Sequence, residues 1–447
     1  MSCLGEIAIW ESVTAAATSA LASTLAAFGL ILVLTRLKCP LSIAILAGAV
    51  ALDVLFGRGP VEILTLSAAG AVQPRTIGLV LVVVLMLVLS ETMRRAGQLD
   101  EIVVLAKSFL RRPAVTMAAL PALIGLMPMP GGAQLSAPMV ESAAGGARVR
   151  PDRLSAINYW FRHIWEYWWP LYPGVMVATS LTRSDPAQFA MYQLPLGVCM
   201  AASGLLLFRG SHPDLHRSAP RAAGHVGRLL RATSTIWVIL LVWGAVRAVL
   251  ALALAPPAEG SPLAAAGRYG PLAVGLAVSL AWTMRMNRLG AGELLAVLKR
   301  TIIYKLAAIV VSVMIFWYAV REAGVAARIA GELARLRVPP EVVVAVLPLI
   351  AGLVTGLAVG FVGTSFPIVL AVVAEMPHSG SIRPYVALAY AFGHLGQMLS
   401  PLHICQVLSN EYFQAGSRAV YRRIVPAAAA TGALAVAYFL LLRWILA

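Results

Sequence analysis

The chain is short of charge and of cysteine. Charged residues make up 12% of its 447 residues, whereas a soluble domain usually carries about 25%, so an ordinary soluble fold is excluded. The four cysteines, at positions 3, 39, 199 and 405, show no Cys-x-x-Cys spacing. This pattern indicates neither a disulfide framework nor a cysteine metal motif. We expect small apolar packing residues at these positions.

Motifs of the common enzyme classes are absent as well. The sequence has no Gly-x-Ser-x-Gly, no His-Glu-x-x-His, no Gly-Lys-Ser/Thr phosphate loop and no dinucleotide fingerprint. We therefore expect no enzyme, no cofactor and no direct use of ATP. The net charge of +16 does not indicate a nucleic-acid partner, because the basic residues lie in short stretches between apolar runs, as in membrane proteins.

Apolar residues, by contrast, make up 60% of the chain, and the mean hydropathy is +0.84. The N-terminus carries Glu6 and Glu11 but no basic stretch, unlike a signal peptide, so the first apolar run is kept as a helix. We predict an all-α integral membrane protein with about ten transmembrane helices of roughly 20 residues. They are expected at residues 14–35, 39–57, 77–93, 154–181, 187–208, 233–255, 270–285, 302–320, 384–408 and 424–446.

Two halves of the sequence repeat each other. The pattern Tyr-x-Phe-x-His-x6-Pro begins at Tyr159 and again at Tyr390. Upstream, Gly-x4-Ser-x-Pro begins at Gly131 and again at Gly360, and a third match, Arg-x-Ala-Gly, precedes it in both halves. The interval between the two copies is nearly the same for all three matches. Ordered matches at such similar intervals in an apolar chain are typical of transporters built from internal repeats.

Each half also contains an interrupted apolar segment. Residues 113–147 form two short arms broken at 127–133, and residues 339–377 form two short arms broken around 360–365. Arms of roughly 12–18 residues are too short for a comfortable span. We therefore predict two re-entrant hairpins.

Basic residues indicate the topology. They are concentrated in alternate connecting segments and in the linker at 209–231, so the positive-inside rule predicts that both chain ends lie outside. Five spans in each half then place the halves in opposite orientations, with one hairpin entering from the cytoplasm and the other from outside. We predict a first repeat at 1–208 with a broken helix at 154–181. The second repeat is predicted at 232–447, with a broken helix at 384–408.

The predicted outer side is poorer in basic residues, with one exception. Its loops carry Arg58, Arg75, Arg183 and Arg268, and the segment from Arg321 to Arg337 adds four arginines against the rule. The overall bias still favours an N-out, C-out, multi-pass protein of a bacterial cytoplasmic (inner) membrane.

Several stretches resemble a known family. They are Leu126–Pro138, the aromatic run through His163, Ser400–Cys405 and Glu411–Phe413. The chain resembles an uncharacterised family of bacterial and archaeal membrane proteins grouped with the ion transporter superfamily, which includes citrate, dicarboxylate, gluconate and arsenite carriers. The resemblance implies an elevator-type transporter with a homodimeric scaffold. It also implies a transport domain made of both hairpins and both broken helices.

Each hairpin tip is expected to begin a helix inside the membrane. Free amide groups and the helix dipole at such a start attract an anion, and unwound carbonyls nearby suit Na⁺. Ser136 and Ser365 are expected to cap these starts, each followed by proline two residues later. A plain helix kink is the alternative. The substrate ligands predicted at the tips are Gly131, Gly132, Gln134, Ser136, Gly363, Thr364 and Ser365.

Polar residues share one face of the helix after each hairpin. The matched sets are Tyr159, His163, Glu166 and Pro170, then Tyr390, His394, Gln397 and Pro401. The two histidines are predicted to bind substrate or carry protons; alternatively, they brace the hairpins. Arg162 is either a substrate anchor, since a guanidinium matches a carboxylate, or the ion-pair partner of Glu166.

Four residues are candidates for binding the coupling ion, Na⁺ or H⁺: Glu141, Glu166, Gln397 and Asp53. Ionisable residues inside a membrane usually have a function. Glu141 lies one and a half turns after the first tip and alternatively marks the interfacial end of that arm. Glu91 is a further acid in an apolar run.

The sequence therefore predicts a secondary transporter of a small organic anion, driven by an ion gradient and embedded in a lipid bilayer. Three other functions stay open. A cation/proton antiporter needs a titrating acid such as Glu141 or Asp53. A channel would show flux without saturation. An intramembrane enzyme would use His163 or His394 with a nearby serine.

Overall fold

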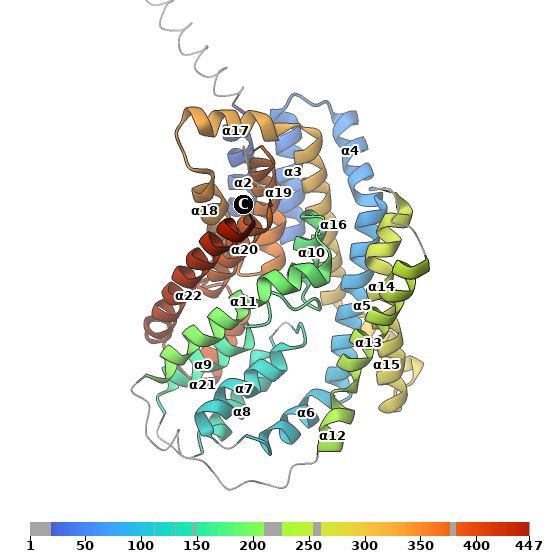
Figure 1. Ribbon diagram of the computed structural model, residues 1–447, viewed down its shortest axis with the longest axis vertical. Helices are drawn as coiled ribbons and strands as arrows, with labels where there is room; N and C mark the ends of the chain where they lie inside the picture. The colour runs from blue at the N-terminus through green and yellow to red at the C-terminus, as the bar shows by residue number, and fades with distance from the viewer. Residues whose placement is uncertain are drawn as a thin grey trace, which may run out of the picture.

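The computed structural model describes residues 19–110, 112–129, 131–145, 149–209, 226–253, 261–375 and 381–446. Within these residues every regular element is a helix and no strand occurs (Figure 1). The predicted all-α class is confirmed. Parts of the first predicted span and most of the linker at 209–231 lie outside the described residues.

Helices of the first half follow one another through short connections. They are α2 (Ala20–Arg36), α3 (Leu41–Leu55), α4 (Pro60–Val72), α5 (Pro74–Arg95), α6 (Gln98–Lys107), α7 (Pro113–Gly125), α8 (Ala133–Ala143), α9 (Pro151–Arg162), α10 (Pro173–Leu181), α11 (Pro186–Gly204) and the 3₁₀ helix η1 (Leu205–Phe208). Several begin with proline at the first position, where its fixed φ and missing N–H cost nothing.

The second half repeats this order. Its helices are α12 (Val226–Ala232), α13 (Ser234–Ala253), α14 (Pro262–Met286), α15 (Ala291–Leu298), α16 (Thr301–Glu322), α17 (Val325–Arg335), α18 (Pro340–Thr355), α19 (Ala358–Ala374), α20 (Arg383–Met398), α21 (Ile404–Phe413) and α22 (Ser417–Leu446). The starts of α5, α6 and α7 precede those of α16, α17 and α18 by one constant interval, that of the Arg-x-Ala-Gly match. The starts of α10 and α11 precede those of α21 and α22 by the interval between Tyr159 and Tyr390. The motif repeat is therefore a repeat of helix order.

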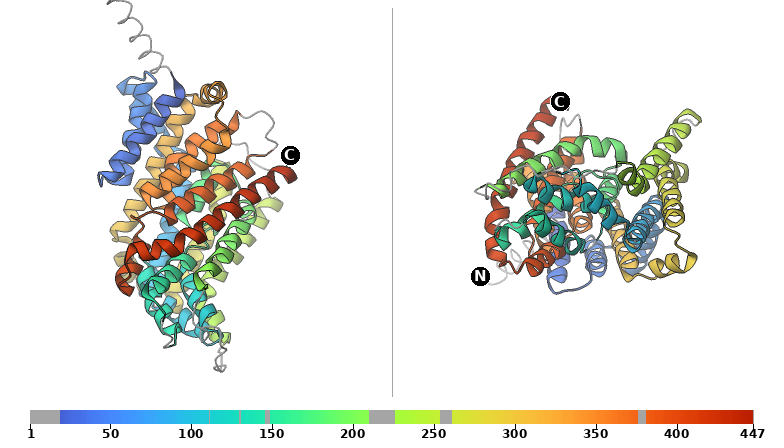
Figure 2. Two further views of the ribbon diagram at one scale, coloured as in Figure 1. Left: turned by 90° about the vertical axis from the view of Figure 1, so that its left-hand side faces the viewer. Right: turned by 90° about the horizontal axis from the view of Figure 1, so that it is seen from below.

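Six of the described helices are long and apolar enough to cross a membrane: α5, α11 with η1, α13, α14, α16 and α22. Shorter apolar helices, among them α2, α3, α7, α18 and α19, accompany them. The chain is therefore a multi-pass membrane protein by length and composition. Figure 2 shows α22 crossing one side of the molecule obliquely, and it packs beside α20.

Several helices were not expected from the sequence: α4, α6, α12, α15 and α17 lie outside the predicted spans and hairpins. Residues 60–72, predicted to be an outer loop, form α4, which packs on α16 and continues into α5 through a kink at Gln73. Pro74 explains the kink, because proline cannot continue the hydrogen-bond ladder and keeps the preceding residue extended.

The hairpins α7–α8 and α18–α19 lie toward opposite ends of the molecule (Figure 1). The first tip, predicted at 127–133, lies between Gly125 at the end of α7 and Ala133 at the start of α8, with Pro130 outside the described residues. The second tip was predicted around 360–365, which is wrong: the chain turns at Gly356, and residues 360–365 lie inside α19. Gly356 has φ +64°, a conformation that glycine adopts without strain, and it closes α18.

Both predicted broken helices are interrupted. Residues 163–172 separate α9 from α10, and residues 399–403 separate α20 from α21. The piece after each break packs on the hairpin of the other half, α10 on α19 and α21 on α8. The two halves are therefore interlocked at the breaks.

Matched glycines bring each hairpin close to its own broken helix. A Cβ at Gly125 of α7 would overlap the carbonyl oxygen of Arg162, and a Cβ at Gly352 of α18 would overlap the carbonyl oxygen of Gly393. Gly352 is the repeat equivalent of Gly125, at the interval that relates α7 to α18. Gly393 is likewise the equivalent of Arg162, at the interval of the tyrosine motif. The same close approach is thus built in both halves.

Candidate functional site

The two broken helices cross near their interruptions. The hydroxyl of Tyr159 on α9 donates to the carbonyls of Met398 at 3.2 Å and Gln397 at 3.4 Å, at the end of α20. The hydroxyl of Tyr390 on α20 donates to the carbonyl of Glu166 at 2.9 Å. Equivalent tyrosines therefore hold the opposite half, as a pseudo-two-fold relation between the halves requires.

Glu166 and Gln397 mark where this relation is centred. They occupy equivalent positions in the two sequence repeats, and the Gln397 amide donates to the Glu166 carboxylate at 2.7 Å. Both side chains are buried. Two equivalent residues in direct contact place the pseudo-symmetry axis between them.

Both predicted histidines lie beside this carboxylate. His163 Nε2 is 3.8 Å from Glu166 Oε1, and His394 Nδ1 is 3.9 Å from Glu166 Oε2. The ring of Tyr167 packs against His394 at 4.4 Å. Neither ring nitrogen of His394, nor the side-chain oxygen of Gln397, has a hydrogen-bond partner among the described residues. Buried polar atoms are rarely left unpaired, so this centre is equipped to bind a further group.

Arg162 reaches the first hairpin tip instead of Glu166. Its Nη2 donates to the Met129 carbonyl at 2.7 Å, and a Cβ at Gly132 would overlap its guanidinium. The alternative ion pair with Glu166 is not formed among the described residues. The side chain is 2% exposed, and its Nε and Nη1 have no hydrogen-bond partner there. A buried guanidinium with free donors suits an anion.

The first tip differs in detail from the prediction. Gly131 adopts φ +73°, and Gly132, not Ser136, is the N-cap of α8. Ser136 lies in the first turn, where its hydroxyl makes only long contacts of 3.4 Å with backbone carbonyls of that turn. Gln134 also lies in this turn. Gly132 takes the cap position because its small size leaves room for the Arg162 guanidinium.

The predicted ligands of the second tip lie away from a helix start. Thr364 and Ser365 donate to the carbonyls of Gly360 and Phe361 within α19, at 2.8 and 2.6 Å. The predicted role of Ser365 as a helix cap is therefore wrong, because α19 already begins at residue 358 and Leu357 is its N-cap. Gly363 instead makes room for α16, since a Cβ there would overlap a side chain of that helix.

The other predicted acids are away from the centre. Asp53, at the end of α3, pairs with Arg58 at 2.6 Å. Glu141 is exposed and accepts from the Tyr412 hydroxyl at 2.8 Å. Glu91 pairs with Arg94 at 2.6 Å. Of the four candidates for the coupling ion, the structure brings together Glu166 and Gln397.

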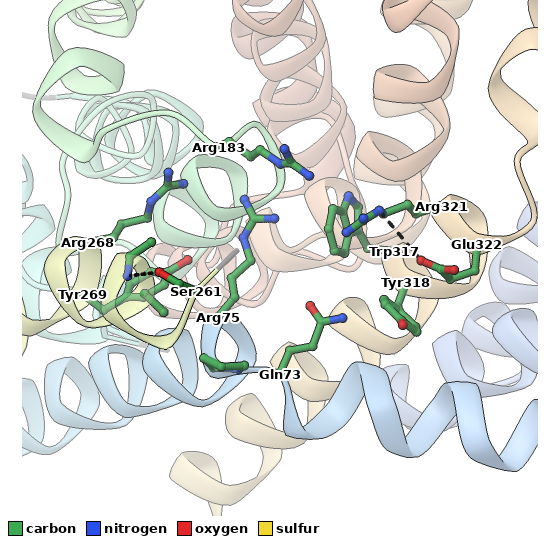
Figure 3. Close-up of a pocket in the computed structure, with 13 residues that line it drawn as sticks. Gln73, Arg75, Arg183, Ser261, Arg268, Tyr269, Trp317, Tyr318, Arg321 and Glu322 are labelled. Atoms are coloured by element: carbon green, nitrogen blue, oxygen red, sulfur yellow. Dashed lines mark hydrogen bonds and ion pairs between the residues drawn. The ribbon is translucent and has the colours of Figure 1, made fainter. Parts of the chain in front are cut away.

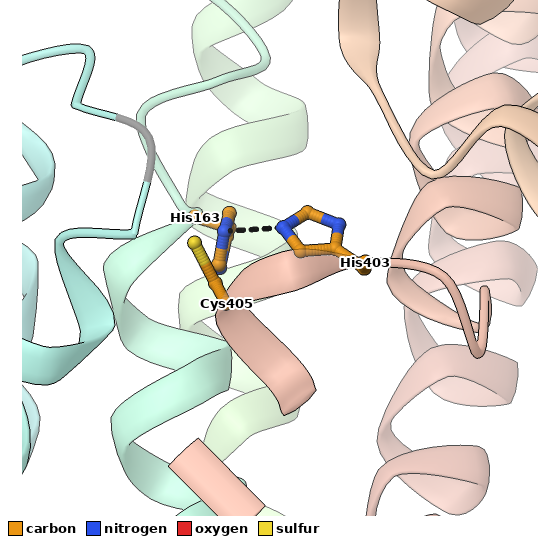
Figure 4. A group of neighbouring side chains, drawn as sticks. All are labelled: His163, His403 and Cys405. Atoms are coloured by element: carbon orange, nitrogen blue, oxygen red, sulfur yellow. Dashed lines mark hydrogen bonds between the residues drawn. The ribbon is translucent and has the colours of Figure 1, made fainter. Parts of the chain in front are cut away.

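Two residues at the crossing were missed from the sequence. His403 Nε2 lies 3.0 Å from His163 Nε2, and Cys405 joins them so that the three ligand atoms lie within 4.8 Å of one another (Figure 4). His163 Nδ1 faces the Tyr159 carbonyl at 2.6 Å. A carbonyl only accepts, so we assign the proton to Nδ1, which leaves Nε2 as an acceptor. Two imidazoles and a thiol are ligands that suit a soft transition metal.

The repeat gave no signal for this pair, because the equivalent positions in the first half are Tyr172 and Gly174. Another polar link was missed too: Asn158 donates to Ala133 at 3.1 Å and to Ser409 at 2.8 Å. It joins α9 to both α8 and α21. The linking role of Asn158 depends on the fold and cannot be recognised from a single sequence.

The comparisons with known proteins assign no activity. No functionally described protein matches the chain. One family model covers residues 17–253 and 271–442, which is most of the sequence and includes both hairpins and both broken helices. The chain belongs to this family, described as a protein family of unknown function, DUF401.

Proposed function

We propose that the protein is a secondary transporter that moves a small organic anion across a bacterial cytoplasmic membrane by elevator-type alternating access. Ten spans and two re-entrant hairpins, both ends outside and a homodimeric scaffold belong to this proposal, as does membership of the ion transporter superfamily. Two inverted halves that meet in mid-membrane suit alternating access, because rocking about the shared centre opens it to either side in turn.

The observation that supports the proposal best is the buried crossing of the two breaks. Broken backbone, two histidines, Gln397 and the single carboxylate of Glu166 lie together there, with several polar atoms unpaired. Burying such groups in a membrane protein is costly unless they bind something. A purely structural core would avoid this free-energy cost by using apolar side chains at these positions.

Substrate and coupling ion are assigned to neighbouring groups. The free donors of Arg162 at the first hairpin tip suit one or two oxygens of a carboxylate. Glu166 takes up the coupling ion, H⁺ or Na⁺, and thereby loses its negative charge next to the incoming anion. Because like charges repel strongly in a buried site, binding of the cation and of the anion would favour each other.

Thermal-shift screening of purified protein tests the proposal. Citrate, succinate, gluconate, phosphonoacetate, glutamate and arsenite would be screened with and without Na⁺ and at two pH values. A bound ligand raises the melting temperature with concentration. We expect at least one carboxylate to stabilise the wild type, and the stabilisation to be lost in Arg162→Gln. The proposal would be contradicted if no ligand raised the melting temperature or was taken up, with or without Na⁺ and at either pH.

A cation/proton antiporter is the second candidate. The observation in its favour is that the Glu166 carboxylate lies between two imidazoles and carries the only buried negative charge seen at the crossing within the described residues. The two functions separate by mutation. An antiporter would lose proton flux in Glu166→Gln and keep it in Arg162→Gln, whereas an anion transporter would lose transport in both.

A further inference from the structure

Four arginines gather around one cavity that shares no lining residue with the crossing. The cavity measures about 650 Å³ and lies between α5, α14, α16 and the loop after α10. Its arginines are Arg75, Arg183, Arg268 and Arg321 (Figure 3). Glu322 is the one carboxylate among its described lining residues. The lining therefore carries a clear excess of positive charge.

Two of the arginines, Arg75 and Arg321, are held in place by the walls of the cavity. The guanidiniums of Arg75 and Arg321 lie over the ring of Trp317, at 4.9 and 5.7 Å from its centroid. Arg75 also donates to the carbonyl of Ser180, whose hydroxyl accepts from Tyr269 at 2.9 Å. Stacking and hydrogen bonds of this kind fix the direction of a guanidinium and reduce the entropy lost on binding a ligand.

One donor is left unused. Nη1 of Arg268 is buried and has no hydrogen-bond partner among the described residues. Arg321 pairs with its neighbour Glu322 at 3.9 Å, a long contact. Gathering guanidiniums around a partly enclosed space is unfavourable unless a counter-charge enters, because their mutual repulsion is weakly screened there.

The four arginines were all noted in the sequence, but only Arg321 belongs to the segment that goes against the positive-inside rule. They come from segments predicted to face outside, where the positive-inside rule expects few basic residues. Arg75, Arg183 and Arg268 come from three separate loops or helix ends, and Arg321 begins the segment that goes against the rule. Their convergence on one cavity gives a functional reason for placing four arginines on the side where few basic residues are expected.

We propose that this cavity binds an oxyanion carrying two or more negative charges, a phosphate or a polycarboxylate. Guanidinium forks match the geometry of such oxygens. A second cavity of about 340 Å³ shares Arg183, Trp317 and Arg321 and is otherwise lined largely by apolar side chains such as Leu370. The anion therefore has room for an apolar tail, and a free solute and a lipid headgroup offer the same chemistry. The proposal does not depend on the transport function.

Binding to lipid-depleted protein tests it. Inorganic phosphate and citrate would be titrated by calorimetry, and phosphatidylglycerol would be compared with phosphatidylcholine by native mass spectrometry. We expect at least one of these anions to bind and phosphatidylcholine not to. Binding of phosphate or citrate identifies a solute site, and selective retention of phosphatidylglycerol identifies a lipid site. Failure of all three anions to bind would overturn the proposal.

Charge-removing variants locate the binding. Arg268→Gln and Arg321→Gln should each weaken anion affinity roughly tenfold, the usual effect of losing one charge-assisted hydrogen bond. Arg285→Gln is the matched control, because it removes the same charge from the far, exposed end of α14. Equal weakening by the control, or no weakening by the two cavity variants, would refute the site.

Folding of the variants is checked separately by thermal melting and gel filtration. If Arg268→Gln does not fold, Arg268→Lys keeps the charge and loses the planar fork. We then expect an affinity between those of wild type and Arg321→Gln. If the affinity were unchanged both in Arg268→Lys and in Arg321→Gln, these two arginines would not bind the anion.

Discussion

The two halves place the same backbone around the crossing but different charges on it. Tyr159 donates to the carbonyl of Gln397 and Tyr390 to the equivalent carbonyl of Glu166, and the glycine contacts of α7 and α18 match as well. Yet the position of Arg162 is Gly393 in the second half, and the position of Glu166 is Gln397. The framework and the histidine pair His163 and His394 are duplicated, whereas the arginine and the carboxylate are present in the first half alone.

A physical reason for this asymmetry lies on the pseudo-symmetry axis. Glu166 and Gln397 are 2.7 Å apart, so two carboxylates there would repel and could not both ionise. An amide at one position supplies a donor to the carboxylate at the other. One titrating group on the axis serves both halves, whichever side of the membrane the site faces.

Removal of that carboxylate should give the largest effect. Glu166→Gln leaves two amides on the axis and no charge, so uptake driven by an ion gradient should fall on the order of 100-fold, the scale of losing a positioned proton-transfer group. The measurement is uptake of the identified ligand into proteoliposomes. Glu141→Gln is the control, because that acid is exposed and away from the crossing, and it should retain uptake.

Exchange of the two residues sharpens the comparison. The double variant Glu166→Gln, Gln397→Glu moves the carboxylate to the equivalent position in the other half. If the halves are related as described, it should recover a measurable part of the uptake lost in the single variant, while Gln397→Glu alone should be impaired by carboxylate repulsion. A double variant no more active than Glu166→Gln would show that the positions are not equivalent.

Alanine at the matched glycines should disturb both halves similarly. In Gly125→Ala and Gly352→Ala the new Cβ meets a backbone carbonyl that cannot move without shifting a helix, so each should lose about 1–3 kcal/mol of stability. Melting in detergent measures the effect. Gly244→Ala on α13 has open space around it and should be neutral or slightly stabilising. If only one of the two alanine variants lost stability, the two halves would not be equivalent at these glycines.

The entry to α9 is tied to the other half by charge. Asp152 accepts hydrogen bonds from Arg150 and from Arg423 of α22. Burial disfavours its charged form, but these hydrogen bonds outweigh burial and hold the pKa of the carboxyl below its ordinary 3.8. The stabilisation is therefore present above about pH 3.8 and is lost as the pH falls through the folded-state pKa.

Asp152→Asn tests this link. It should cost about 1–2 kcal/mol at neutral pH, and its deficit relative to wild type should shrink in acid. Melting temperatures of both proteins measured from pH 7 down to pH 3 give the difference. A deficit that stays constant over this range would rule out the carboxylate as its source.

The smallest effect is expected at the serines of the repeated motif. Ser365 donates to a carbonyl of its own helix and Ser136 touches only carbonyls of its own turn, so Ser136→Ala with Ser365→Ala should change stability by less than about 0.5 kcal/mol per site. Ligand affinity should stay within about twofold of wild type. A strong loss of ligand affinity in the double variant would show that the hairpin serines bind the ligand.

Much of the framework could be predicted from the sequence, because identical residues at equal spacing mark equivalent places. Tyr159 with Tyr390 and Glu166 with Gln397 were found this way. The second tip was misplaced, because Gly131 lies in the first turn whereas its match Gly360 lies inside α19. The second turn depends on the left-handed Gly356, which the match does not include.

Other features depend on contacts that one sequence does not reveal. His403 and Cys405 lie where the halves differ, so the repeat could not find them. Helix α4 has 13 residues, too few for the span length used to find helices. The arginine cavity combines α5, α14 and α16, and only packing brings these together.

Crosslinking at the pseudo-symmetry axis tests the central claim most directly. In a chain whose native cysteines are replaced, Glu166→Cys and Gln397→Cys would be joined in membranes by a short, reducible bifunctional thiol reagent, because the contact is made by the ends of two long side chains. The linker would then be cut at an inserted protease site. The crossing described here predicts that the two halves stay joined on a non-reducing gel and separate after reduction. Halves that separate without reduction, while a Glu141→Cys, Tyr412→Cys pair stays joined, would contradict it.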